Sequence, residues 1–249
     1  MAATRYATAN KILNDVAVES GLLPVADPFL ASDPQWIQLQ YLMNTAGEEM
    51  LELHEWSVLR ATHTIVVDNA TYPDGYYPLP SDYSYMIDQT GWDRDNFLPL
   101  QGPTTPQQWT YLEGRDLASN TIYATFRLTD GEIWFYPANA MQDGKTITFE
   151  YIRRTWVESG SPPTTVFNDI VTSGNDRILY EPILFKRFLK MKFLGAKGFD
   201  TTAATNEFTA GMNAWTGLQG GAPVLRAARS QRYPFLNVWR NLPDTGYGS

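Results

Sequence analysis

The spacing of apolar residues changes twice along the chain, and this change constrains the fold more than any single motif. Before about Arg60, apolar residues recur every three or four positions, as in amphipathic helices. From there to about Val157 they alternate with polar residues, as in strands, and helical spacing returns after Asp169. This order predicts an α+β protein: a helical bundle formed from both chain ends, with an inserted antiparallel β-sandwich or barrel and an extended C-terminal tail.

Two helices are expected before the strands. The first covers Thr8–Gly21. The second begins with Asp33 as N-cap and Pro34 at the first helical position, where the missing N–H of proline costs nothing. Its apolar stripe is Trp36, Leu39, Met43, Ala46, Met50 and Leu53. Its last part carries Glu48, Glu49, Glu52 and Glu55, where the helix dipole does not stabilise acids, so a solvated face and a basic partner in a neighbouring subunit are both open interpretations.

The middle of the chain predicts antiparallel strands. Segments rich in β-branched and aromatic residues cover Thr62–Asp68, Thr121–Thr129, Glu132–Pro137 and Lys145–Val157, and the Asp130-Gly131 pair between the second and third predicts a hairpin. The proline-broken stretch Tyr72–Gly114 is expected to hold short strands near 83–88 and 97–100 and a short helix near 106–113. Its aromatic residues are assigned either to core and rim or to a contact surface: Tyr72, Tyr76, Tyr77, Tyr83, Tyr85, Trp92, Phe97, Trp109 and Tyr111.

The last third of the chain returns to helices. Ser159–Asp169 is expected to be an irregular linker because Gly160, Pro162 and Pro163 break regular structure. A helix over 178–199, starting near 175–182, is apolar almost all round and must be covered on several sides; a further helix is expected over 201–218. The first of these carries a basic ridge of Lys186, Lys190 and Lys197, with Arg187 at its margin.

These elements predict four regions: 1–58 and 159–222 as two parts of a helical domain, 59–158 as an inserted β-rich domain, and 223–249 as an extended docking tail. The tail combines arginines and apolar residues with prolines that disfavour a helix, so we expect it to order against another surface. The docking candidates are Arg226, Arg229, Arg232, Tyr233, Phe235, Leu236, Trp239 and Arg240.

The charge of the chain is divided by position. Residues 1–176 carry nine Lys/Arg against twenty-three Asp/Glu, whereas residues 177–249 carry ten against four. Such asymmetry favours contact between complementary surfaces, including copies of the same chain. The candidate intersubunit residues are Glu48, Glu49, Glu52 and Glu55 on one side and Lys186, Arg187 and Lys190 on the other.

Catalytic and cofactor motifs are not found in the sequence. There is no cysteine, and His54 and His63 lack metal-ligand spacing. No nucleophile elbow or phosphate-binding loop occurs, and carboxylate pairs such as Asp93 and Asp95 do not by themselves indicate a hydrolase. No signal peptide or membrane span is expected. The sequence therefore predicts neither an enzyme nor a cofactor.

Three features follow one another in the chain: the helix pair, a β segment that opens with THTIVVDNATYPDGYYPLPSDY and closes with EIWFYP and TITFEYIRRTW, and the helix ILYEPILFKRFLKMKFLGAKGFD. Together they resemble the head-to-tail adaptors of short-tailed bacteriophages, also called tail tubular protein A or head-completion adaptors. The resemblance covers about 7–218. It implies a structural virion protein of the neck, made in the host cytoplasm, with typically twelve copies in a ring between the portal and the tail nozzle and genomic DNA passing non-specifically through the centre. It also implies that a C-terminal extension grips the portal. Two alternatives are another ring-forming neck protein, and a carbohydrate-binding or hydrolytic tail module, for which the aromatic stretch 72–109 is the support.

Overall fold

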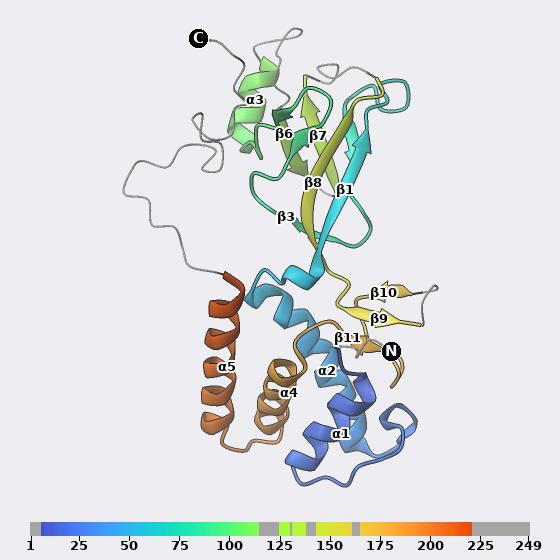
Figure 1. The fold of residues 1–249 in the computed structure, drawn as a ribbon, viewed down its shortest axis with the longest axis vertical. Coiled ribbons are helices and arrows are strands. Elements are labelled where there is room, and N and C mark those ends of the chain that lie inside the picture. Colours follow the sequence, from blue (N-terminus) through green and yellow to red (C-terminus); the bar gives the residue numbers. More distant parts are fainter. Residues whose placement is uncertain (1–5, 115–124, 130, 138–142, 161–164, 221–249) are drawn as a thin grey trace, which may run out of the picture. The chain divides into compact units, whose positions relative to one another are not determined.

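The computed structural model describes residues 6–114, 125–129, 131–137, 143–160 and 165–220 (Figure 1). Helices come first, strands follow and helices return, which confirms the α+β class. The expected C-terminal tail lies outside the described residues. The division into four regions stays a prediction.

The first two helices begin where the sequence indicates. Helix α1 (Ala9–Glu19) is capped by Thr8, whose side chain accepts a hydrogen bond from the Lys11 N–H at 3.4 Å. Helix α2 (Pro34–Leu53) is capped by Asp33, which accepts from the Gln35 N–H at 2.8 Å. A short 3-10 helix, η1 (Pro28–Leu30), lies in the connection between them. The local capping chemistry thus sets both helix starts.

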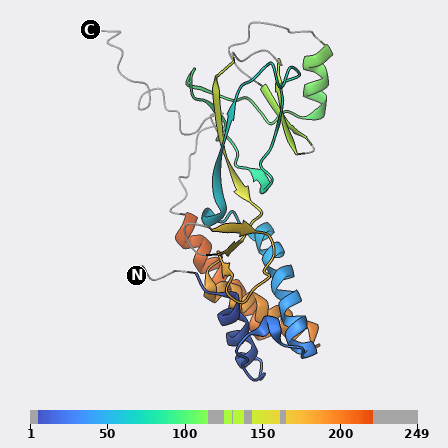
Figure 2. The ribbon, with the colours of Figure 1, turned by 90° about the vertical axis from the view of Figure 1, so that its right-hand side faces the viewer.

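Helices α4 (Pro182–Ala196) and α5 (Thr202–Gly220) form the returning helical part. Pro182 occupies the first position of α4, as predicted, and Gly198 adopts a positive φ of 76° in the turn that separates the two helices. Helix α4 contacts α1 and α2, and α5 packs on it through the Phe188 and Phe208 rings, whose centroids are 4.7 Å apart (Figures 1 and 2). Covering by three helices accounts for the apolar composition of α4.

The β-rich part consists of two sheets. In the larger one, β1 (Arg60–Val66) and β8 (Thr146–Arg153) pair antiparallel, β3 (Tyr83–Met86) and β4 (Trp92–Asp93) pair with β8, and β5 (Leu98–Pro99) pairs with β4. The smaller sheet has the order β2 (Tyr76–Pro78), β7 (Glu132–Tyr136), β6 (Thr125–Thr129). Both sheets contribute side chains to one core, which includes Ile65, Tyr77, Phe126, Ile133, Phe135, Ile147 and Phe149. A shared core between two sheets is the arrangement of a sandwich.

Local signals predicted several details of this part. Strands β6 and β7 pair antiparallel around the Asp130-Gly131 position, and Gly131 has a positive φ of 81°, as a tight hairpin requires. Residues 121–124 and 130 lie outside the described part of the chain. Helix α3 (Pro106–Gly114) occurs where it was expected and buries Trp109.

The prediction of an irregular linker over Ser159–Asp169 was wrong at Ser159 and at Val166–Asn168, which belong to strands; residues 161–164 lie outside the described part of the chain. Strand β9 (Val157–Ser159) pairs with both β10 (Val166–Asn168) and β11 (Arg177–Ile178) to form a third sheet. Strands of two or three residues are too short for the alternation of apolar and polar residues to reveal them. The buried Asp176 carboxylate holds this region: it accepts from the Ser159 hydroxyl at 2.7 Å and from the Thr172 and Ser173 N–H groups at 2.9 and 2.8 Å.

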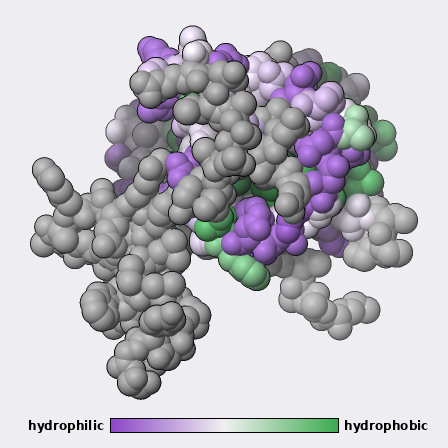
Figure 3. All heavy atoms as spheres, turned by 90° about the horizontal axis from the view of Figure 1, so that it is seen from above, coloured by the Kyte–Doolittle hydropathy of each residue, from purple (hydrophilic) through white to green (hydrophobic). Residues whose placement is uncertain are grey.

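The aromatic residues of the proline-rich stretch differ in burial, and a role in contact with another surface stays a prediction for the exposed ones. Tyr77 and Trp109 are buried, whereas Phe97 and Tyr111 are 81% and 56% exposed. Tyr76 stacks on Trp134 with ring centroids 4.2 Å apart, so these two rings cover each other. On the face drawn in Figure 3, hydrophilic residues of the described part of the chain separate the hydrophobic ones into small areas.

Candidate assembly surfaces

An aromatic stack fixes α2 against α4. Trp156 follows β8 and stacks on Tyr180, which in turn stacks on Phe185 of α4; successive ring centroids are 5.8 and 5.7 Å apart. Gly47 of α2 lies against the Trp156 indole, and the Tyr180 hydroxyl donates to the Gly47 carbonyl at 2.9 Å. Burial raises the pKa of Tyr180 well above its usual range. The surface of α2 that faces away from this stack is therefore rigidly positioned.

Three lysines of α4 form ion pairs with the first two helices. The Lys186 Nζ lies 3.0 Å from an Asp15 carboxylate oxygen, and the Lys190 Nζ lies 3.0 Å from a Glu19 carboxylate oxygen. Lys192 pairs with Glu49 of α2. These pairs join α4 to helices more than 140 positions earlier in the chain. Much of the basic ridge is thus matched within one chain.

The structure places the seven predicted intersubunit residues in two groups. Lys186, Lys190 and Glu49 have the partners just described, and Glu55 lies 2.8 Å from the Arg60 guanidinium. Glu48, Glu52 and Arg187 form no ion pair within the described part of the chain. Pairing between subunits stays a prediction, and these three residues are the ones that remain available for it.

One surface of α2, which we call the α2 face, consists of Ile37, Tyr41, Glu48 and Glu52. The intervals of four, seven and four residues place them on one side of the helix, opposite the buried Leu39, Met43 and Met50. Ile37 and Tyr41 are 54% and 73% exposed. The exposed Leu30 of η1 belongs to the connection that leads into α2, and no Lys or Arg occurs between Lys11 and Arg60. The α2 face is therefore apolar at its N-terminal half and acidic at its C-terminal half.

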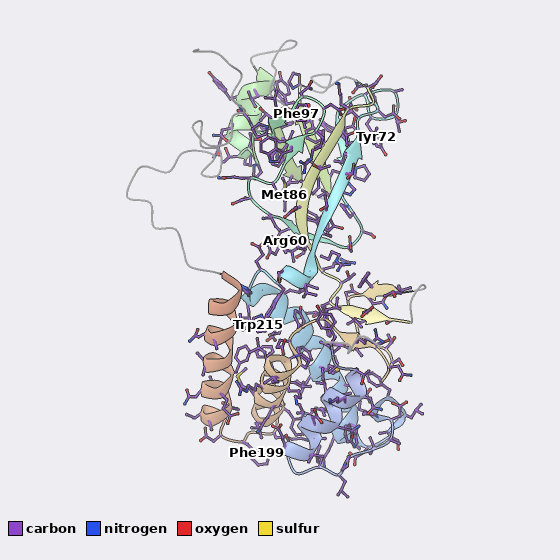
Figure 4. All side chains as sticks on the ribbon, viewed as in Figure 1. Arg60, Tyr72, Met86, Phe97, Phe199 and Trp215 are labelled. Atoms are coloured by element: carbon purple, nitrogen blue, oxygen red, sulfur yellow. The ribbon has the colours of Figure 1, made fainter. Side chains whose placement is uncertain are left out.

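A second surface, which we call the α4–α5 face, consists of Arg187, Lys197 and Phe199. Phe199 is 63% exposed in the turn between α4 and α5 (Figure 4). The Lys197 Nζ lies 5.2 Å from the Phe193 ring, and the Arg187 guanidinium donates to the Glu207 carbonyl at 3.3 Å. Neither cation has a carboxylate partner among the residues that the structure describes. This face is basic with an exposed aromatic ring.

Ile37 and Tyr41 could have been recognised from the sequence as candidates for a contact surface. Ile37 and Tyr41 are apolar, yet they lie outside the stripe that begins Trp36, Leu39, Met43. Apolar residues on the side of a helix that should face solvent indicate a contact surface. The ion-pair residues Asp15, Glu19 and Lys192 were also missed, because their partners are distant in the sequence.

The predicted portal-docking residues, Arg226 to Arg240, lie outside the described residues.

Side chains that could have indicated chemistry have structural roles. Asp93 is buried and accepts hydrogen bonds from the backbone N–H groups of Asp95 and Asn96, both at 3.0 Å, while Asp95 accepts from the Thr146 N–H at 2.6 Å. These carboxylates therefore hold the β4–β5 turn against β8. Burial lowers the pKa of His63 below its usual range, against the opposing charge of Asp82.

Two negative findings apply to the described part of the chain only. There, no three His, Asp or Glu side chains gather as they would around a metal ion. None of the helices in that part is long and apolar enough to cross a bilayer.

The comparison with protein families agrees with the resemblance found in the sequence. No curated protein matches the chain. The family model described as SU10 adaptor protein matches residues 7–233, which include all the described helices and strands. The family is one of phage adaptors, structural proteins of the virion neck. A match over most of the chain shows that this protein belongs to the SU10 adaptor protein family.

Proposed function

We propose that the protein is a head-to-tail adaptor: a non-enzymatic subunit of a ring, of about twelve copies, that joins the portal to the tail nozzle. The observation that carries this proposal is the family match over residues 7–233. The α2 and α4–α5 faces support it, because they carry exposed apolar residues beside charges of opposite sign, which suits contact between copies of the chain. Its function on this view is mechanical: copies pack side by side, and two larger assemblies bind to the ring.

The C-terminal region 223–249 is proposed to bind the portal. It carries four arginines and one acidic residue, with aromatic and aliphatic residues between the arginines. Buried aromatic and arginine side chains supply much of the binding energy at protein interfaces. Removing 223–249 should leave a folded body that no longer binds portal rings, and undiminished portal binding by the truncated protein would reject this assignment.

Genomic DNA is proposed to pass through the ring without specific contacts. Lys and Arg contacts to phosphates release counterions and would hold the DNA, whereas an acidic or neutral wall lets it move. The formal net charge of −8 is compatible with such a wall. A ring reconstruction in which Lys and Arg dominate the channel wall would contradict this part of the proposal.

The decisive experiment is to locate the protein in particles. Cryo-electron microscopy of intact virions, with antibody labelling of the protein, should place it at the neck between the capsid vertex and the tail nozzle. Negative-stain microscopy of the purified protein with and without portal rings should show an added ring only on the portal. Labelling elsewhere in the particle would reject the adaptor function and another neck protein alike, and labelling on the tail would favour the tail-module alternative.

A further inference from the structure

We infer that the ring interface is formed by the α2 face of one copy docking on the α4–α5 face of the next copy. This inference rests on the proposed ring and names the surfaces that would close it. The occupant of the α2 face is thus a second copy of this chain. Three properties of the two faces carry the inference: their charges, their exposed apolar residues and their levels along the helices.

The two faces carry side chains of opposite charge that form no ion pair within the described part of the chain. Glu48 and Glu52 on the α2 face have no ion-pair partner in the described part of the chain, and the region from residue 12 to 59 contains eight acidic residues and no Lys or Arg. Arg187 and Lys197 on the α4–α5 face also lack a carboxylate partner there. Lys186, Lys190, Lys192 and Glu49 are paired within the chain, whereas the exposed Glu207 of α5 forms no ion pair among the described residues. Arg187 and Lys197 therefore remain available to meet Glu48 and Glu52 of a neighbouring copy, as complementary charges at an interface require.

Each face also presents an exposed apolar side chain beside its charges. Tyr41 is 73% exposed and Ile37 is 54% exposed on the α2 face, and Phe199 is 63% exposed on the α4–α5 face. Exposed ion pairs contribute only about 0 to 1 kcal/mol each. Most of the affinity must therefore come from burying these side chains, with the charges selecting the partner and the register.

The groups of the two faces also match in level, by which we mean their position along the helix axes. Figure 4 places Arg60, which follows α2, and Phe199, which follows α4, at opposite ends of the helical part, so α2 and α4 run in opposite directions. The Lys192–Glu49 pair marks a common level. Tyr41 precedes Glu49 by eight residues, which is about 12 Å along α2. Phe199 lies in the turn just past Ala196, the last residue of α4, so it is displaced from that level in the same direction.

The charged groups follow the same correspondence. Glu52 and Arg187 lie on the other side of the common level, three residues after Glu49 and five residues before Lys192, which is about 5 and 8 Å along their helices. Lys197 lies between the levels of Glu48 and Tyr41. In a closed ring with its axis along these helices, neighbours are related by rotation without translation, so equal levels meet. Tyr41 then meets Phe199, and Glu52 meets Arg187.

The two faces belong to different surfaces of one chain. The α2 face points away from the core of the helical part, whereas the α4–α5 face lies on α4 and on the turn that leads into α5 (Figures 1 and 2). Each copy can therefore use both faces at once, which makes the contact heterologous and able to propagate around a ring.

The chain contains no cysteine, so engineered cysteines provide a clean test. The double variant Tyr41→Cys/Phe199→Cys is treated with a short bis-maleimide cross-linker over a concentration series and in purified particles. We expect a ladder of covalent oligomers that closes at the ring size. Each single variant should give at most dimers. The matched control is Tyr41→Cys/Phe97→Cys, because Phe97 is 81% exposed but belongs to the β-rich part, and it should give no ladder.

A second experiment tests the charges. We expect Glu48→Lys/Glu52→Lys and Arg187→Glu/Lys197→Glu each to weaken self-association by about tenfold in sedimentation, and the fourfold variant to recover most of that loss. Reversal of the exposed acids Asp74 and Asp88, in the β-rich part, is the control and should change nothing.

The inference is overturned by no ladder from Tyr41→Cys/Phe199→Cys in either solution or particles, by an equal ladder from the control pair, or by a fourfold charge variant no better than the double reversals. None of these outcomes moves the protein away from the neck of the virion. Failure of this interface is therefore distinguishable from failure of the adaptor function.

Discussion

Gly47→Ala is expected to destabilise the protein, although alanine is the better helix former. A Cβ atom at position 47 would lie 2.0 Å from Cζ2 of Trp156 and 2.3 Å from its Cε2 and Cη2 atoms. Carbon atoms pack at about 3.5 to 4.0 Å, so the indole or the α2 backbone must move by about 1.5 Å. The indole is fully buried and stacked on Tyr180, so it has no free space to enter.

The expected magnitude follows from three contributions. Overpacking a core costs about 1 to 3 kcal/mol, and losing the hydrogen bond from the Tyr180 hydroxyl to the Gly47 carbonyl costs about 1 kcal/mol more. Replacing glycine by alanine inside a helix returns about 1 kcal/mol. The net loss in the free energy of unfolding is therefore about 2 kcal/mol, measured by urea denaturation with tryptophan fluorescence as the signal.

A matched control separates packing from helix propensity. Gly217 lies in α5, and a Cβ added there has no atom within 4 Å. Gly217→Ala should therefore leave stability unchanged or raise it by up to about 1 kcal/mol. If Gly47→Ala is as stable as the wild type, or if both substitutions shift the free energy of unfolding alike, the indole does not constrain position 47 and the reasoning fails.

Three further predictions concern the rest of the described structure. Asp176→Ala should lower the free energy of unfolding by about 3 kcal/mol because the donors of Ser159, Thr172 and Ser173 lose their acceptor, and a loss below about 1 kcal/mol would contradict the buried geometry. Burial and the Asp82 carboxylate raise the pKa of Tyr151 to about 12. Below pH 10 the folded and unfolded chains both keep the Tyr151 proton, so this group lowers the free energy of unfolding only as pH rises from about 10 to 12. Tyr151→Phe should reduce that fall in urea titrations at a series of pH values. An unchanged dependence on pH would argue against the raised pKa. Lys192→Met should cost less than about 1 kcal/mol by the same assay, since its partner Glu49 is partly exposed; a larger loss would mean that the pair is more than a surface ion pair.

Sequence reasoning succeeded where the determining interactions are local. The start of α2 follows from Asp33 and Pro34, and the β6–β7 hairpin follows from a glycine at the turn. It failed for β9 and β10, because three-residue strands depend on pairing that no local pattern encodes. The spacing that assigns Trp156 to the end of a strand segment also gives no indication that its indole enters the helical core.

The same division applies to the candidate surfaces. Helical geometry correctly grouped Lys186 and Lys190, but it could not reveal that Asp15 and Glu19, 171 positions away, already neutralise them. Which charges remain available is a property of the folded chain. Reducing the seven candidate intersubunit residues to Glu48, Glu52 and Arg187 therefore required the structure.

The pairing of Arg60 with Ile152 has a consequence for how such proteins change over evolution. The chain enters and leaves the β-rich part through two hydrogen-bonded strands, and Leu59 and Ile152 at their base both belong to the helical core. A short hairpin turn could join these strands without altering the path of the helices. We therefore expect that evolution can replace the β-rich part or change its length while the helices keep the same connections.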